Sequence, residues 1–219
     1  MPPPLPFVAA LASMLATGAG GGAGSANDPT PLVGEPMQGP FATVEAACKR
    51  CRDSRTVARP AAPFLEARIL VSGDLKQRPS RSNPNRHYVA ARLQSGWYLR
   101  EIGSDTTMCG EGEISVMVFE DRLETTNLLP GGGAQILVEA SQTTRDGERN
   151  SQVDDRRLHL CGVGASGRPS CTSLHTYHFT GRAAESWDTP VTFRKNGVVV
   201  QAGQAGATEI ERKHVVRFP

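Results

Sequence analysis

Hydrophobic and polar side chains alternate along most of the chain after Pro63. A period of two is typical of β-strands that bury one face, and Gly, Pro, Asn and Asp residues separate the alternating runs about every 8–20 residues. The alternation predicts about ten short strands, at residues 64–72, 87–94, 97–102, 113–123, 135–143, 157–161, 171–180, 191–194, 198–201 and 210–218.

One helix is predicted ahead of these strands, over residues 43–52. Phe41, Val44, Cys48 and Cys51 recur at spacings of three and four, and Thr43 is a suitable N-cap. No helical pattern separates the strands, so a parallel α/β sheet is disfavoured. The predicted fold is mainly β: a single antiparallel β-sandwich or curved meander barrel with one short N-terminal helix, formed by residues 41–219.

The N-terminus has the pattern of a secretory signal peptide. Residues 5–19 are uncharged, no charged side chain precedes Asp28, and the small residues Gly24, Ser25 and Ala26 fit a cleavage site before Asn27. An apolar run of this length falls short of the ~20 residues that span a bilayer, so no transmembrane anchor is expected in the mature chain. Residues 1–26 are therefore predicted to be a signal peptide, and the mature protein to be secreted or periplasmic.

Residues 27–40 contain four Pro and two Gly, which predicts an extended, flexible linker. The composition after the leader is globular, and 24 basic residues nearly balance 22 acidic ones, giving a net charge of +2. This balance gives no electrostatic case for a nucleic-acid partner. Arg outnumbers Lys 20 to 4, which is typical of GC-rich bacterial genomes.

Five cysteines follow the leader, and in an oxidising compartment they are first interpreted as disulfides. Cys161 and Cys171 flank a Gly- and Pro-rich loop, and a bridge between them would join the ends of a hairpin. Cys109 is predicted to pair with Cys48 or with Cys51. We predict a Cys48–Cys109 bridge with Cys51 as a possible free thiol, and the alternative is a Cys51–Cys109 bridge.

The histidines are candidate metal ligands. If Cys161 lies opposite Cys171, then Ser173 faces His159 and Arg157 faces His175, so the two histidines become diagonal neighbours. No third ligand is evident, and no metal site is assigned. His175 and His178 form an H-x-x-H, but residues three apart on a regular strand point to opposite faces.

A long polar loop at residues 74–85 suggests a possible anionic or glycan ligand. Its basic side chains and the aromatic residues of the next predicted hairpin would supply charge and stacking surface: Lys76, Arg78, Arg81, Arg86, Trp97 and Tyr98. Long loops are sometimes functional, although charged runs are usually only solvated.

No catalytic motif or cofactor signature is found. The sequence therefore favours an exported, disulfide-stabilised β-domain acting as a non-enzymatic binding or structural module of the bacterial envelope. The alternative is a thiol-redox or metal-handling protein that uses the C-x-x-C at Cys48 and Cys51. A third hypothesis, a hydrolase, would require two of His87, His159 and His175 to cluster with a carboxylate.

Overall fold

The structure is a computed structural model that describes residues 28–219 except residues 58, 74–78, 81, 109–113, 131–132, 148, 150 and 195–196. The predicted signal peptide, Cys109 and the basic residues Lys76, Arg78 and Arg81 lie outside the described residues. In the part of the chain that is described, no helix is long and apolar enough to cross a membrane.

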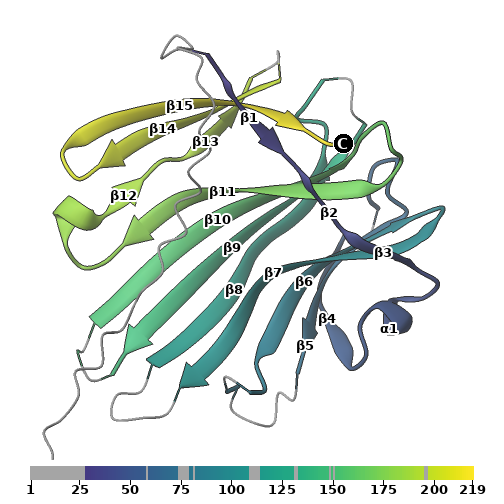
Figure 1. Ribbon diagram of the computed structural model, residues 1–219, viewed down its shortest axis with the longest axis horizontal. Helices are drawn as coiled ribbons and strands as arrows, with labels where there is room; N and C mark the ends of the chain where they lie inside the picture. Colours follow the sequence, from purple (N-terminus) through teal and green to yellow (C-terminus); the bar gives the residue numbers. More distant parts are fainter. Residues whose placement is uncertain are drawn as a thin grey trace, which may run out of the picture.

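The fold is mainly β, as predicted, and consists of one sheet of fifteen strands (Figure 1). The N-terminal elements are β1 (Thr30–Val33), β2 (Glu35–Pro36), β3 (Gln38–Phe41), α1 (Val44–Ala47) and β4 (Cys51–Val57). The central strands are β5 (Glu66–Ser72), β6 (Asn85–Leu93), β7 (Gly96–Met108), β8 (Ile114–Thr126), β9 (Gln135–Asp146), β10 (Ser151–Val163) and β11 (Pro169–Phe179). The C-terminal elements are the 3-10 turn η1 (Ala183–Glu185), β12 (Trp187–Asp188), β13 (Val191–Phe193), β14 (Val198–Ala205) and β15 (Thr208–Arg217).

The sheet is an open meander and is not closed into a barrel. Strands β4 to β11 are neighbours in chain order, and the sheet continues through β12, β14 and β15 to β1. Ten strands correspond to the predicted ones, and the five additional strands are β1, β2, β3, β4 and β12.

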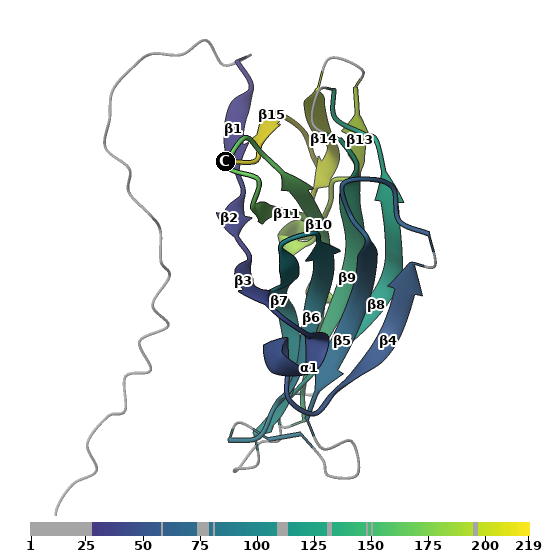
Figure 2. The same ribbon diagram turned by 90° about the vertical axis from the view of Figure 1, so that its right-hand side faces the viewer.

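Residues 30–41, expected to be a flexible linker, instead form three short strands that we call the N-terminal segment. The segment crosses the sheet: β1 pairs with β15 in parallel, β2 with β11, and β3 with β7 (Figures 1 and 2). Proline favours extended backbone and is tolerated in short edge strands, so the composition that suggested a linker is also compatible with this pairing.

The predicted helix is shorter than expected. Thr43 caps it as predicted, since its hydroxyl accepts a hydrogen bond from the backbone N–H of Ala46 at 3.1 Å. The helix ends at Ala47, and Arg50 adopts a left-handed conformation with φ 64°, which a continuing α-helix cannot contain. The chain then enters β4 at Cys51.

Three clusters of buried side chains lie on the two faces of the sheet. The first combines residues of β5–β7 with residues of β9–β11, including Ile69, Val89 and Ile136, so these two parts of the sheet share a core. The second lies on the opposite face of β9–β11 and contains Leu137, Leu160 and Val199. The third, built on Leu70, Ala90, Trp97 and Leu99, is covered by α1 and β3. Strands β9–β11 therefore contribute buried side chains from both faces.

Two disulfides are present among the described cysteines. Cys161 bonds to Cys171 within the first cluster, and the two residues are direct partners in the β10–β11 ladder. Cys48 bonds to Cys51 rather than to Cys109, so Cys51 is not the free thiol. The turn through Arg50 brings these two residues together, with their Cα atoms 5.5 Å apart, whereas the prediction assumed a helix through both.

Candidate metal centre

A bulge between β10 and β11 creates the most distinctive polar cluster of the described chain. Arg157 pairs with His175 and Arg156 pairs with Tyr177, so Thr176 is an extra residue on β11. An extra residue interrupts the alternation of side chains along a strand. As a result His175 and His178, three residues apart, emerge on the same face.

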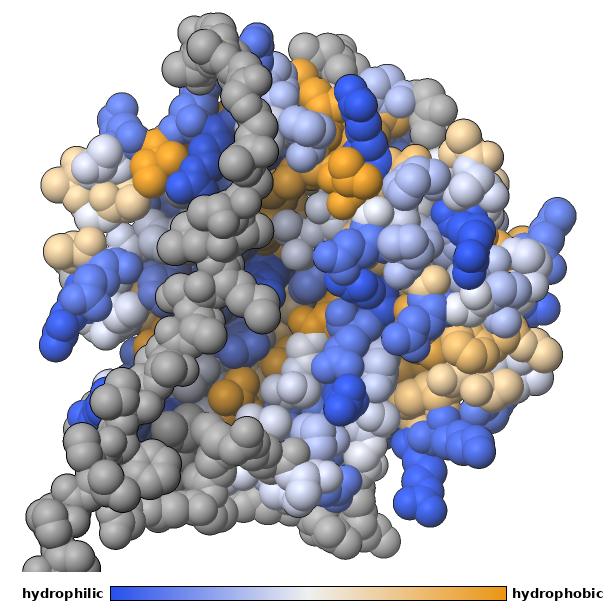
Figure 3. Space-filling view, viewed as in Figure 1, coloured by the Kyte–Doolittle hydropathy of each residue, from blue (hydrophilic) through white to orange (hydrophobic). Residues whose placement is uncertain are grey.

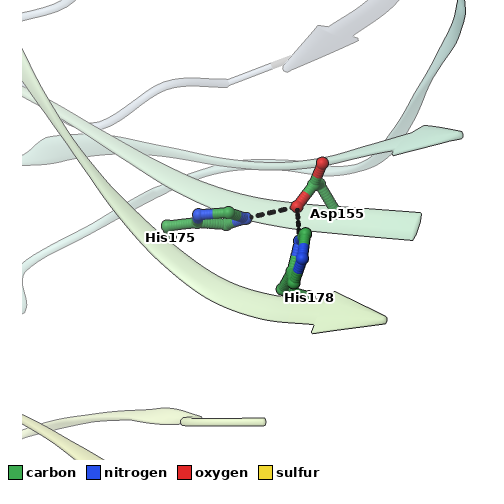
Figure 4. Close-up of side chains that lie close together, drawn as sticks. All are labelled: Asp155, His175 and His178. Carbon is green, nitrogen blue, oxygen red and sulfur yellow. Dashed lines mark hydrogen bonds and ion pairs between the residues drawn. The ribbon is translucent and has the colours of Figure 1, made fainter. Parts of the chain in front are cut away.

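Asp155 completes the cluster from β10, directly opposite His178. The Nε2 atom of His175 and the Nδ1 atom of His178 each lie 2.7 Å from the same oxygen, Oδ1 of Asp155 (Figure 4). The side chains of His175, His178 and Asp155 are 35%, 27% and 18% exposed, respectively, so water and ions can reach them.

The indole of Trp187 on β12 holds the two imidazoles in place. Its ring packs edge-on against His175, with centroids 4.4 Å apart, and stacks on His178 at 5.9 Å. Burial by itself would raise the pKa of Asp155, but the hydrogen bonds and charge of the two histidines outweigh it and lower that pKa. The carboxylate is therefore ionised at neutral pH and available as a ligand.

Buried polar side chains behind the bulge fix its geometry. The amide nitrogen of Gln201 donates to the carbonyl oxygen of His175 and, at 2.8 Å, to the hydroxyl of Thr189. The backbone N–H of Thr189 donates to the carbonyl oxygen of Thr176 at 2.7 Å, and the Thr176 hydroxyl donates to the carbonyl oxygen of Arg156 at 3.1 Å. The carbonyl oxygen and the hydroxyl of Thr176, the extra residue, are thus both hydrogen-bonded, which stabilises the bulge.

The cluster has the composition of a transition-metal site. The ligand atoms of Asp155, His175 and His178 all lie within 4.8 Å of one another. Two imidazoles and one carboxylate are a recurrent set for divalent Zn and Fe, and they leave coordination positions open. For an ion to bind, each ring must carry its proton on the nitrogen that faces away from the ion.

His87 forms a second cluster with carboxylates, but it is buried. Its Nδ1 contacts Oε1 of Glu120, and its Nε2 lies 3.2 Å from Oδ1 of Asp105. Burial alone would lower the pKa of His87, but hydrogen bonding and the charges of Asp105 and Glu120 outweigh it and raise that pKa to about 9. His87 is only 4% exposed, so this cluster joins β6, β7 and β8 rather than presenting a ligand site.

The predicted histidine register is confirmed, but the predicted neighbours do not form the cluster. His159 pairs with Ser173, and Arg157 pairs with His175. Neither His87 nor His159 joins His175, so the condition for the hydrolase hypothesis is not met among these three. His175 instead lies beside His178. This pairing was not predicted, because no feature of the sequence marks Thr176 as a bulge.

The expected aromatic platform for a glycan is not available. Trp97 is 6% exposed and Tyr98 is 2% exposed, because both belong to the core. The guanidinium of Arg68 lies over the Trp97 ring at 5.1 Å, and Arg86 is paired with Glu101 at 2.9 Å.

Comparisons with family models, with curated proteins and with solved structures find no match to this chain.

Proposed function

We propose that this chain is an exported β-domain of the bacterial envelope that acts as a binding module for a divalent transition-metal ion. The observation that supports metal binding is the convergence of Asp155, His175 and His178 on a half-buried surface. The uncharged leader-like N-terminus supports export, and the two disulfides are compatible with an oxidising compartment.

Zn²⁺ added to the metal-free full chain tests the metal site. Binding to the folded state alone should stabilise the protein by about 2.7 kcal/mol when free Zn²⁺ is about a hundredfold above Kd. The rise in Tm, followed by circular dichroism, should be lost in Asp155→Asn and in His178→Gln. It should also weaken as the pH falls, since protons compete for the ring nitrogens.

Asp154→Asn is the matched control, because Asp154 neighbours the site but directs its carboxylate to Thr143, at 2.7 Å, and to Gln152. This variant should keep the full response to Zn²⁺. The metal site would be contradicted if Zn²⁺, Ni²⁺ and Cu²⁺ leave the Tm of the wild type unchanged. It would also be contradicted if Zn²⁺ raises the Tm of all variants equally.

Export is tested separately, by fractionating the native host and sequencing the N-terminus of the protein. We expect a mature chain that begins at Asn27, outside the cytoplasm. Intact chains that retain Met1 in the cytoplasmic fraction would refute export without bearing on the metal site.

A second candidate function is thiol–disulfide exchange at Cys48 and Cys51. The two half-buried cysteines of the C-x-x-C are bonded to each other and border a small cleft with Glu45, Asp53 and Arg68. Under this function, dithiothreitol should reduce the Cys48–Cys51 disulfide before it reduces Cys161–Cys171. The oxidised protein should also form a disulfide in a reduced dithiol test peptide, and its own Cys48–Cys51 bridge should be reduced in exchange. Loss of that transfer in Cys48→Ala/Cys51→Ala would support it, and equal transfer by the variant would exclude it.

A further inference from the structure

A cavity of about 540 Å³ opens between the N-terminal segment and the sheet. Glu35, Pro36 and Gln38 form the wall on the side of the segment. Strands β7, β10 and β11 form the opposite wall, where the polar lining is provided by Arg100, Glu101, Arg157, His159, Thr172 and Ser173. Figure 3 shows that hydrophilic side chains predominate on this side of the molecule, with smaller apolar patches among them.

The charged groups of the cavity do not cancel. Arg100 is paired with Glu35, and Glu101 is paired with Arg86. Arg157 forms no ion pair with any described carboxylate, and its side chain is exposed where β10 borders the cavity. One guanidinium is therefore left to attract an anion, and its fork of N–H groups matches a carboxylate or phosphate.

His159 contributes the second observation. It is 7% exposed and lines the cavity, yet its Nε2 has no hydrogen-bond partner in the described part of the chain. Burial first, and then the charges of Arg157 and Arg100, lower the pKa of His159 to about 4, so the ring is neutral at neutral pH. An unpartnered buried polar atom is costly in a folded protein, so a ligand that accepts a hydrogen bond from this nitrogen would remove that cost.

We propose that this cavity binds a small oxyanion, either a carboxylate or a phosphate, between Arg157 and His159. The Arg157 guanidinium pairs with the anion, and the Nε2–H of His159 donates a hydrogen bond to it. Ser173 lies opposite His159 in the β10–β11 ladder, so its side chain is on the same face and its hydroxyl is available to a further oxygen of the ligand. Because these residues differ from the three proposed metal ligands, the cavity does not depend on the metal.

The Arg100–Glu35 pair links the two walls. It joins β7 to the N-terminal segment across the cavity. An oxyanion with a short carbon skeleton fits a space of this size, since small-molecule sites in proteins occupy about 300–1,000 Å³.

The experiment uses the full chain freed of metal on a chelating resin and titrated by calorimetry, with succinate in one arm and inorganic phosphate in the other. We expect one or both anions to bind, with Kd in the millimolar range or tighter. Arg157→Gln should weaken binding about tenfold or more, and Arg157→Lys should weaken it less. The arm that binds more tightly distinguishes a planar from a tetrahedral anion.

His159→Leu provides a variant that should fold well, because it removes a buried nitrogen that lacks a partner. It should also weaken anion binding. Arg212→Gln, a change to an exposed arginine of β15 outside the cavity, should leave binding unchanged. The proposal is overturned if the wild type binds neither anion up to about 10 mM, or if Arg157→Gln and His159→Leu bind like the wild type.

Retention of anion binding by metal-free protein separates this site from the metal site. Anion binding that appears only after Zn²⁺ is added would place the anion on the metal and overturn the cavity site. A protein that binds the anions but not Zn²⁺ would leave the cavity intact while refuting the proposed metal function.

Discussion

His87 is a buried imidazole held between two carboxylates that also have their own partners. Glu120 accepts a hydrogen bond from Ser54 at 3.1 Å, and Asp105 accepts one from the backbone N–H of Val118 at 2.7 Å. Burial tends to raise the pKa of both carboxyl groups, but the interactions with His87 and these hydrogen bonds lower them. The cluster is therefore charged at neutral pH, with a positive centre and two negative neighbours.

Two of the three buried histidines, His87 and His159, predict a maximum of stability near pH 6.5, the ordinary pKa of histidine. Because the pKa of folded His87 is raised to about 9, its contribution is complete below pH 6.5 and is lost as the pH rises through 9. Because the pKa of folded His159 is lowered to about 4, the free energy of unfolding decreases as the pH falls from 6.5 towards 4. In this range the histidine is protonated in the unfolded state but stays neutral in the folded state. Each shift corresponds to about 3 kcal/mol.

Urea unfolding between pH 4 and pH 9.5 measures this profile, and two variants assign its sides. His159→Leu should flatten the acid side. A triple change, His87→Leu with Asp105→Asn and Glu120→Gln, should flatten the alkaline side without leaving unpaired buried charge. If stability is unchanged from pH 6.5 to pH 9, His87 does not hold its proton as the geometry indicates.

At the scale of single elements, the bulge on β11 depends on Gln201 of β14. Gln201→Leu would leave the Thr189 hydroxyl and the His175 carbonyl without this donor, so we expect a loss of about 1–3 kcal/mol in unfolding free energy. Gln204→Leu, at an exposed position of the same strand, should change it by less than about 0.5 kcal/mol. Equal effects in urea unfolding would mean that the Gln201 contacts contribute little to stability.

The β10–β11 hairpin is also held by its disulfide. In the chain-entropy model, a loop closed by residues ten apart is stabilised by about 3 kcal/mol, so Cys161→Ala/Cys171→Ala should lose about this amount. Cys48→Ala/Cys51→Ala should lose less, because its loop spans only three residues. Calorimetric Tm values of oxidised proteins measure both, and the reverse order would contradict the loop-length argument.

The sequence predicted the long elements better than the short ones. Alternation predicted strands at the positions of β5–β11 and β13–β15, because one buried face imposes a period of two. It also located the β10–β11 register, because Cys161 and Cys171 mark positions that face each other. The bulge was not predicted, since Thr176 resembles any other strand residue and its conformation depends on Gln201 and Thr189, far along the chain.

The metal centre was missed for the same reason. The rule that residues three apart on a strand diverge separated His175 from His178, and it fails where an extra residue interrupts the strand. Asp155 lies just before the predicted strand at residues 157–161, so its position opposite His178 was not predicted. The N-terminal strands could not be predicted either, because their pairing partners on β7, β11 and β15 are distant in sequence.

At the scale of the whole molecule, the C-terminus closes the second cluster. Phe218 packs there, and a Cβ atom at Gly162 would lie 2.3 Å from its ring. The absence of side chains at Gly162 and Gly164 therefore makes room for the end of the chain against β10. The Ser166 hydroxyl adds a hydrogen bond of 2.7 Å to the carbonyl oxygen of Pro219.

Phe218→Ala tests this closure. A half-buried phenylalanine should contribute about 2 kcal/mol to the free energy of unfolding, below the full cost of a buried ring. Phe119→Ala is the matched control, because Phe119 is 49% exposed and should be nearly neutral. Chemical denaturation compares the two, and similar small losses would show that the C-terminus is not an integral part of the core.

The parallel pairing of β1 with β15 has a consequence for biosynthesis. Thr30 lies beside His214, so β1 cannot dock on β15 until the chain has been made as far as β15. Contacts between such distant segments slow folding. Throughout elongation, β9–β11 lack the C-terminal strands that cover one of their apolar faces, and nascent chains with such surfaces tend to aggregate. Until β14 and β15 are made, the apolar face of β9–β11 that they cover is therefore a site of aggregation risk.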